Sequence, residues 1–202
     1  MGSITRGFTG RRQHAQDRLP PGQYDVGTGF PVLTAEVTPE LEPDRWTFTV
    51  EGQVAATRTL TWAQVQTLPR STFRGDIHCV TAWSKLGTSF TGVSLDDLLA
   101  ETPPLPAATH VLAWSHTGYT TNLEVADVVG GRAWVVWEHD GNRLPAEHGG
   151  PVRLLVPHRY FWKSAKWIAG LRFLDHDEPG FWERNGYHLR GDPWREERYA
   201  GD

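Results

Sequence analysis

Short stretches of the chain alternate apolar and polar residues, which is the pattern of a half-buried β-strand. The clearest is 46–50, where Trp46, Phe48 and Val50 fall on one face and two threonines on the other. A second strand is expected close behind it, near 57–60. Later apolar runs predict further strands at 110–114, 133–137, 152–156 and 171–175.

Helical patterns are short and scattered between these strands. Thr61 is a suitable N-cap for a helix that ends before Pro69, and Ser94 caps a second helix with Asp97 at the capping-box position. Long helices do not alternate with the strands, which disfavours a doubly wound sheet. The prediction is an α+β fold with mixed β-sheets and short helices. Residues 23–202 are expected to form one domain after a flexible segment at 1–22.

Composition excludes several classes of function. With 202 residues the chain can bury one sizeable core. Its 20 Lys and Arg side chains against 24 Asp and Glu give a net charge of −4, so no strongly basic face is available for nucleic acid. No stretch approaches the roughly 20 apolar residues that span a bilayer, and no apolar run follows the first residues as in an export signal. We expect a cytoplasmic protein without nucleic-acid or membrane partners.

The single cysteine, Cys79, lies in the stretch DIHCVTAWSKL at 76–86. A lone thiol can fill apolar space, attack a substrate with a base such as His78, or bind a metal as a thiolate. Neighbours on a strand point to opposite faces, which disfavours a pair of Cys79 and His78. No zinc-binding spacing surrounds it. Apolar filler and metal ligand both stay open on these residues alone.

The stretch LPAEHGGPVRLLVPHRYFWKSAKW at 144–167 is rich in donors. Gly149-Gly150 allows close approach of the backbone to a ligand, and Arg153 begins an otherwise apolar strand. Arg153, Lys166 and the amides around Ser164 would suit a phosphate group, because a guanidinium forms paired hydrogen bonds with such an anion. In the alternative interpretation, Arg153 pairs with an acid such as Glu147 and the lysines are solvated.

A third polar group follows the strand at 110–114. The stretch SHTGYTTNLEV at 115–125 gathers hydroxyl, imidazole and amide side chains that could line a pocket. Serine, threonine and asparagine are also ordinary turn residues, so a turn without a binding role explains the same pattern.

Three of these stretches together resemble one family. DIHCVTAWSKL, LPAEHGGPVRLLVPHRYFWKSAKWI and the tail PGFWERNGYHLRGDPW are similar, in this order, to the molybdopterin-dependent oxidoreductases of the sulfite oxidase family. The likeness covers about residues 20–197, and it is to the small, single-domain, cytoplasmic prokaryotic members. A more distant likeness is to the catalytic subunit of the periplasmic methionine-sulfoxide reductase.

The resemblance implies a Mo-molybdopterin cofactor whose metal has Cys79 as its protein ligand. It also implies catalytic roles near the metal for Ser115 and Lys85. A soft thiolate suits such a metal, and a single protein ligand leaves a coordination position for substrate. The cofactor-binding residues that the resemblance implies are Phe30, Leu33, Thr34, His78, Cys79, Ser115, His148, Arg153, Lys163, Ser164, Ala165 and Lys166.

The activity implied is oxygen-atom transfer with a two-electron change at the metal. Vertebrate-like sulfite oxidases have an arginine shortly after the cysteine, whereas Trp83, Ser84 and Lys85 stand here. Reduction of an S- or N-oxide is therefore at least as plausible as oxidation of a sulfite-like substrate. Either small-molecule reaction needs an electron-transfer partner, which the sequence does not identify. A cofactor-free binding module built from the ten tryptophans is the alternative.

Overall fold

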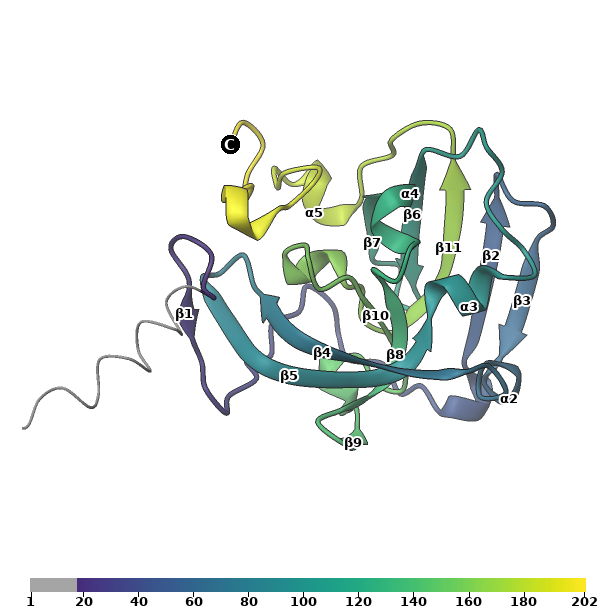
Figure 1. Cartoon of the computed structure of the whole chain (residues 1–202), viewed down its shortest axis with the longest axis horizontal. Coiled ribbons are helices and arrows are strands. Elements are labelled where there is room, and N and C mark those ends of the chain that lie inside the picture. Colours follow the sequence, from purple (N-terminus) through teal and green to yellow (C-terminus); the bar gives the residue numbers. More distant parts are fainter. Residues whose placement is uncertain (1–17) are drawn as a thin grey trace, which may run out of the picture.

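The computed structural model describes residues 18–202, and two mixed β-sheets carry most of their regular structure (Figure 1). The first sheet contains β1 Tyr24–Asp25, β4 Arg70–His78, β5 Trp83–Ser94, β8 Trp134–His139, β9 Asn142–Arg143 and β10 Arg153–Leu155. The second contains β2 Thr47–Gly52, β3 Arg58–Thr61, β6 His110–Ser115, β7 Thr120–Glu124 and β11 Ile168–Leu174. β1 pairs with β5 and β2 with β11 in parallel, and the other neighbours are antiparallel. The predicted α+β fold with mixed sheets is confirmed.

The helices are short, and their starts follow the predicted caps. The α-helices are α2 Trp62–Val65, α3 Leu95–Leu99, α4 Val125–Val128 and α5 Phe181–Arg184. The 3-10 turns are η1 Pro43–Arg45, η2 Ala146–His148, η3 Phe161–Lys163 and η4 Pro193–Arg195. Thr61 caps α2 in a capping box with Gln64, and the Ser94 hydroxyl accepts a hydrogen bond from the Asp97 amide in α3. These caps satisfy amides that a helix start leaves unpaired.

The first sheet is buried on both faces around β8 and β10. Val135 and Leu154 belong to the main core, which also contains the apolar faces of β2 and β11. Their neighbours Val136 and Leu155 face a second apolar cluster that includes Cys79. This alternation follows from the two-residue period of a strand. It places Cys79 over the far face of the sheet, away from the main core.

The two ends of the described chain meet at the turn between β4 and β5. Figure 1 shows β4 and β5 as a long curved ribbon, with β1 and the yellow C-terminal segment at the same end. Arg198 joins them there, because its guanidinium donates to the carbonyl oxygens of Val80 (2.7 Å) and Pro21 (3.2 Å). Segments far apart in sequence therefore hold the turn that follows Cys79.

The predicted elements are largely present, but several observed strands were not predicted. Among them is β7, which lies within the stretch 115–125 where the sequence indicated a turn or a loop that lines a pocket. Strands occur at or near each of the predicted runs, although the helix predicted to end before Pro69 is only one turn long. The β4–β5 hairpin was not predicted from alternation, because much of β4 is exposed or only half-buried. Residues 1–17 of the predicted flexible segment lie outside the described residues, and Arg18 already pairs with Asp76. Between residues 18 and 202, no helix is both long and apolar enough to cross a membrane.

Candidate cofactor site

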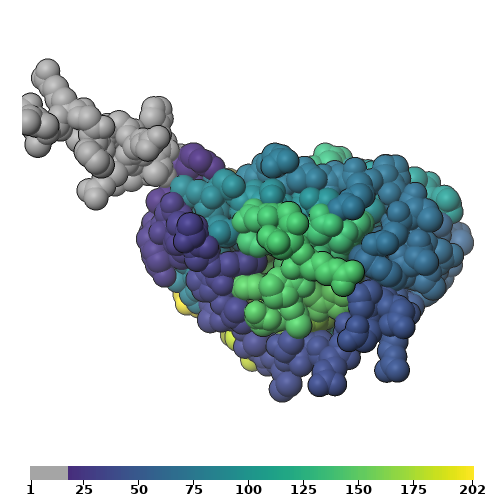
Figure 2. Space-filling view, turned by 90° about the horizontal axis from the view of Figure 1, so that it is seen from below, coloured from purple at the N-terminus to yellow at the C-terminus, as the bar shows by residue number. Residues whose placement is uncertain are grey.

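A cavity of about 300 Å³ lies between the Cys79 turn, the segment before β2 and the connection from β10 to β11. Figure 2, from below, shows the purple and dark-blue N-terminal segment against the green surface of residues around 140–150. Of the residues predicted for cofactor binding, the lining includes Phe30, Leu33, Thr34, Cys79, His148, Arg153, Ser164, Ala165 and Lys166. Three distant stretches of sequence therefore share one cavity.

Cys79 stands at the start of a tight turn that leads into β5. Its amide donates to the Trp83 carbonyl oxygen (2.8 Å), and Ala82 adopts a left-handed conformation with φ of 74°. The Sγ atom lies 3.2 Å from the Thr81 hydroxyl oxygen. Burial raises the pKa of the thiol, and hydrogen bonds from Thr81 and Val80 counteract only part of this effect. The thiol is thus a protonated, shielded group until something displaces its proton.

His78 faces away from this cavity. Its Nδ1 atom lies 2.8 Å from the Ser84 hydroxyl oxygen, which in turn donates to Gln23. Burial lowers the pKa of His78 to about 4, although Asp76 acts in the opposite direction. The geometry therefore agrees with the expectation that Cys79 and His78 do not form a thiol–imidazole pair.

Arg153 is a fully buried cation that has no acidic partner among residues 18–202. It donates to the backbone oxygens of His148 (2.8 Å), Ser164 (2.6 Å) and Leu154 (3.3 Å), and its guanidinium lies 4.0 Å from the centre of the Phe161 ring. No carboxylate among residues 18–202 forms an ion pair with it, so the alternative pairing with Glu147 is not found. Burial lowers its pKa to about 9.

Lys166 adds a second positive charge to the same end of the cavity. Its ammonium donates to the carbonyl oxygens of Leu33 (2.8 Å) and Glu147 (2.6 Å), and so ties the N-terminal segment to the loop before β10. Burial and then the neighbouring charge of Arg153 lower its pKa to about 8. The mutual repulsion of these two buried cations would be relieved by an anion.

The N-terminal segment is held against the cavity by specific contacts. Phe30 stacks on His148 with ring centres 3.8 Å apart and planes 9° apart. Burial and then the charge of Arg153 lower the pKa of His148 to about 4, so its imidazole is neutral near pH 7. The Glu36 carboxylate accepts hydrogen bonds from the Thr117 hydroxyl and the Tyr119 amide. These contacts give the otherwise irregular segment a defined path.

Besides His78, three predicted site residues do not line the cavity. The Lys85 ammonium donates to the Gly29 oxygen (3.2 Å) and supports the turn before Phe30. The Ser115 hydroxyl lies 2.8 Å from that of Thr117. The Lys163 ammonium is enclosed by hydrogen bonds to Asn122, Glu183 and Leu189. The structure gives all three side chains structural partners, and their roles toward substrate or cofactor stay predictions.

The aromatic wall of the cavity was not predicted residue by residue. Tyr119, Trp162, Trp182 and Tyr187 line it together with Trp83. Trp182 and Tyr187 stack with ring centres 4.8 Å apart, and Tyr187 meets Trp162 edge-on at 5.0 Å. The available signals were the unusual tryptophan content and the aromatic tail of the chain. Neither could show which rings would converge.

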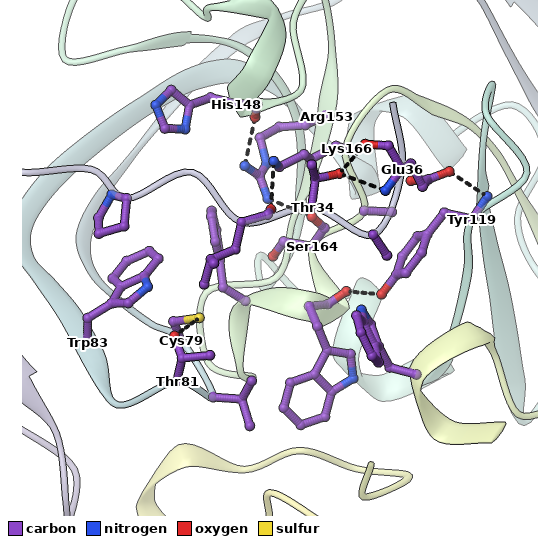
Figure 3. Close-up of a pocket in the computed structure, with 18 of the residues that line it drawn as sticks. Thr34, Glu36, Cys79, Thr81, Trp83, Tyr119, His148, Arg153, Ser164 and Lys166 are labelled. Carbon is purple, nitrogen blue, oxygen red and sulfur yellow. Dashed lines mark hydrogen bonds between the residues drawn. The ribbon is translucent and has the colours of Figure 1, made fainter. Parts of the chain in front are cut away.

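Figure 3 separates the two ends of the cavity. Cys79, Thr81 and Trp83 lie at one end, and His148, Arg153 and Lys166 lie at the other. One end therefore contains a thiol and the other contains positive charge. A ligand that spans both needs an anionic group and a group that binds sulfur.

Comparisons with known proteins agree with this arrangement. Residues 35–182 match the family described as "oxidoreductase molybdopterin binding domain". The uncharacterized oxidoreductase YuiH of Bacillus subtilis is 40% identical over 193 residues, which cover 95% of this chain and 97% of that protein. The protein-methionine-sulfoxide reductase catalytic subunit MsrP of Gluconobacter oxydans is 27% identical over 180 residues, which cover 80% of this chain.

A solved structure shows the same fold at lower sequence identity. The sulfane dehydrogenase SoxCD from Paracoccus pantotrophus superimposes with a TM-score of 0.62 and 19% identity, over 88% of this chain. This chain spans 56% of the length of both MsrP and the SoxCD chain. The family match and the similarity to YuiH confirm the predicted family. The chain belongs to the oxidoreductase molybdopterin binding domain family and is a molybdenum-dependent oxidoreductase of the sulfite oxidase type.

Proposed function

We propose that the cavity binds Mo-molybdopterin, with its phosphate at Arg153 and Lys166 and its metal next to Cys79. The observation that carries this proposal is the buried Arg153, which has three carbonyl partners and no carboxylate in the described chain. Burying an uncompensated charge is costly, and a protein retains such a charge where a ligand supplies the opposite one. A phosphate accepts the remaining charge-assisted hydrogen bonds of a guanidinium and an ammonium.

The other residues of the cavity also suit this cofactor. Phe30 and His148 present a stacked, uncharged wall on which a flat ring system can lie. Gly149 has φ of 102° and would bring an added Cβ within 3.0 Å of Arg153 and Lys166, so only glycine lets the chain pass so close to the proposed phosphate site. The donor set thus includes charge for a phosphate, a face for a ring and a thiol for a metal.

Cys79 is the proposed protein ligand of the metal. A thiol must lose its proton to bind a metal, and burial raises the pKa of Cys79, so its proton would leave only when a metal is bound. Thr81 then has a hydroxyl at 3.2 Å that can donate to the resulting thiolate. When bound, the cofactor supplies the two-electron oxygen-atom chemistry, while the chain positions it, shields it and shapes the access of substrate.

The proposed substrate is a neutral S- or N-oxide, which is reduced. The cationic side chains of the cavity are Arg153 and Lys166 at the proposed phosphate end, and Lys85 is directed to backbone oxygens outside it. Cys79 instead shares an apolar cluster with aromatic side chains such as Trp162. An aromatic wall favours an uncharged, partly apolar substrate over a sulfite dianion, which needs paired donors. The sulfoxide reductase activity in the name of MsrP supports the same direction.

This reaction requires electrons from outside the chain. We propose that a separate electron-transfer protein supplies them. The residues that line the cavity, all within the described part of the chain, include no second redox group that could do so. A small redox dye can replace this partner in an assay.

The test is expression in a host that makes molybdopterin, followed by metal and pterin analysis and dye-linked turnover in both directions. We expect about one molybdenum and one pterin per chain, as a single cofactor site requires, and reduction of sulfoxides or N-oxides by reduced dye. Protein that is free of metal and pterin would refute the cofactor assignment. Sulfite oxidation without any oxide reduction would refute the proposed direction alone.

A further inference from the structure

Trp83 differs from Trp46, Trp162 and Trp167, which are also buried, in the hydrogen bonding of its indole N–H group. The indole nitrogens of Trp46, Trp162 and Trp167 donate to Ile168 (2.7 Å), Glu183 (2.9 Å) and Ala146 (2.9 Å), respectively. Trp83 is only 4% exposed, and its Nε1 atom is buried with no acceptor among residues 18–202. A buried donor without a partner is rare in native proteins, because its lost hydration is not replaced.

The position of Trp83 explains where a partner would come from. Cys79 and Trp83 face each other across the turn, since the Cys79 amide donates to the Trp83 oxygen at 2.8 Å. Residues opposite each other in a hairpin project from the same face, and both side chains line the cavity. His78 and Ser84, one position further along, bond to each other on the opposite face.

The indole is held in this orientation by its surroundings. Phe30 and Phe161 meet the ring edge-on, with ring centres 6.2 and 6.3 Å away. Figure 3 shows Trp83 beside Cys79 at the end of the cavity opposite Arg153. The left-handed Ala82 fixes the short turn between the two residues. The ring of Trp83 is therefore held in place by packing at the end of the cavity that also contains Cys79.

We propose that Trp83 is a cofactor-contacting residue whose Nε1–H group donates a hydrogen bond to an acceptor atom at the metal end of the bound cofactor. This inference rests on the proposed function and adds one residue to it. The hydrogen bond forms only in the loaded protein, so its contribution appears in cofactor retention and not in the stability of the cofactor-free chain. A purely structural tryptophan would contribute equally to both.

The sharpest probe removes the N–H group and keeps the shape of the ring. Site-specific incorporation of β-(3-benzothienyl)alanine at position 83 does this, and the same replacement at position 46 is the matched control. We measure urea unfolding of the cofactor-free proteins and the rate of pterin loss from the loaded proteins. At position 83 we expect unchanged or higher stability without cofactor and roughly tenfold to a hundredfold faster pterin loss. At position 46 we expect lower stability of the cofactor-free protein and a rate of pterin loss close to that of wild type.

Trp83→Phe is the second variant, in case the unnatural residue does not fold into a stable protein. Because phenylalanine leaves a small void, its effect on pterin loss is compared with its effect on the cofactor-free chain. Retention equal to wild type in either variant overturns the inference. The inference is also overturned if the replacement at position 83 lowers the stability of the cofactor-free protein as much as the replacement at position 46 does. If wild-type protein binds no pterin, the proposed function fails first, and that result is distinguishable because it needs no variant.

Discussion

Replacing Arg153 with methionine allows two effects of its charge to be measured separately: the effect on folding stability and the effect on cofactor binding. Methionine has a similar length and no charge, so the variant removes the buried cation without a large void. We expect Arg153→Met to change the stability of the cofactor-free protein little and to weaken cofactor retention strongly. The prediction follows from the absence of an acidic partner for Arg153 within the described residues.

The size of the effect can be worked out from the contacts of Arg153. A pKa of about 9 in place of 12.5 corresponds to roughly 5 kcal/mol for keeping the charge at neutral pH. Because burial lowers the pKa of this basic group, the destabilisation is fully present below about pH 9. It disappears as the pH rises toward the pKa of arginine in the unfolded chain. Against it, the carbonyls of His148 and Ser164 lose donors, at about 1–3 kcal/mol each. The two effects oppose each other, and the net change lies between about 1 kcal/mol of destabilisation and about 3 kcal/mol of stabilisation.

For cofactor retention, no opposing effect offsets the loss of the Arg153 charge. Losing a charge-assisted hydrogen bond to phosphate costs roughly 1.5–3 kcal/mol, which is on the order of a tenfold to hundredfold weaker hold. The assay combines urea unfolding of cofactor-free protein with molybdenum and pterin content after gel filtration of loaded protein.

Arg159 provides the control for this experiment. It is buried like Arg153, but its guanidinium binds the carboxylate of Asp127 at 2.8 Å. Arg159→Met should therefore destabilise the protein with and without cofactor by about 3–5 kcal/mol, because it leaves a buried carboxylate short of a partner. If Arg153→Met behaved like Arg159→Met, or retained pterin as well as wild type, the proposed phosphate site would be wrong.

Two further predictions concern Cys79 and Asp127. Cys79→Ala should fold and still bind pterin through Arg153 and Lys166, but lose the visible sulfur-to-metal absorption and oxygen-atom transfer; a retained spectrum and turnover would exclude Cys79 as the ligand. For Asp127, burial acts to raise the pKa, but hydrogen bonds from His158 and Arg159 outweigh it and lower the pKa from 3.8 to about 2. Asp127 should therefore contribute about 2 kcal/mol above pH 4 that is lost as pH falls toward 2, and Asp127→Asn should reduce this dependence in urea unfolding; an unchanged dependence would contradict it.

Sequence patterns predicted the elements whose local signals were strong. The strand at 46–50, the caps Thr61 and Ser94, and the apolar strand around Arg153 all depend on neighbours within a few residues. Such signals follow from strand and helix periods and from unpaired amides at helix starts, which act over short distances. The resemblance of three stretches to one family added the cofactor and the candidate thiolate, and the family is confirmed.

Only the tertiary structure decided what each charged side chain contacts. Lys163 and Arg153 lie in the same stretch of sequence, yet Lys163 pairs with Glu183 whereas Arg153 has no acid within reach in the described chain. Spacing along the chain cannot distinguish them, because the partner of a buried charge comes from another element through the packing of the sheets.

The same reason explains why the cavity could be predicted only in part. Cys79, Arg153 and Lys166 were identifiable as types of residue suited to a metal and a phosphate. Their convergence with Phe30, and the position of the Trp83 indole beside Cys79, depend on how the segment before β2 packs against the first sheet and the loop before β10. The sequence by itself determined which chemical groups are available. The fold determined which of these groups have partners within the described protein, because pairing depends on distances in space.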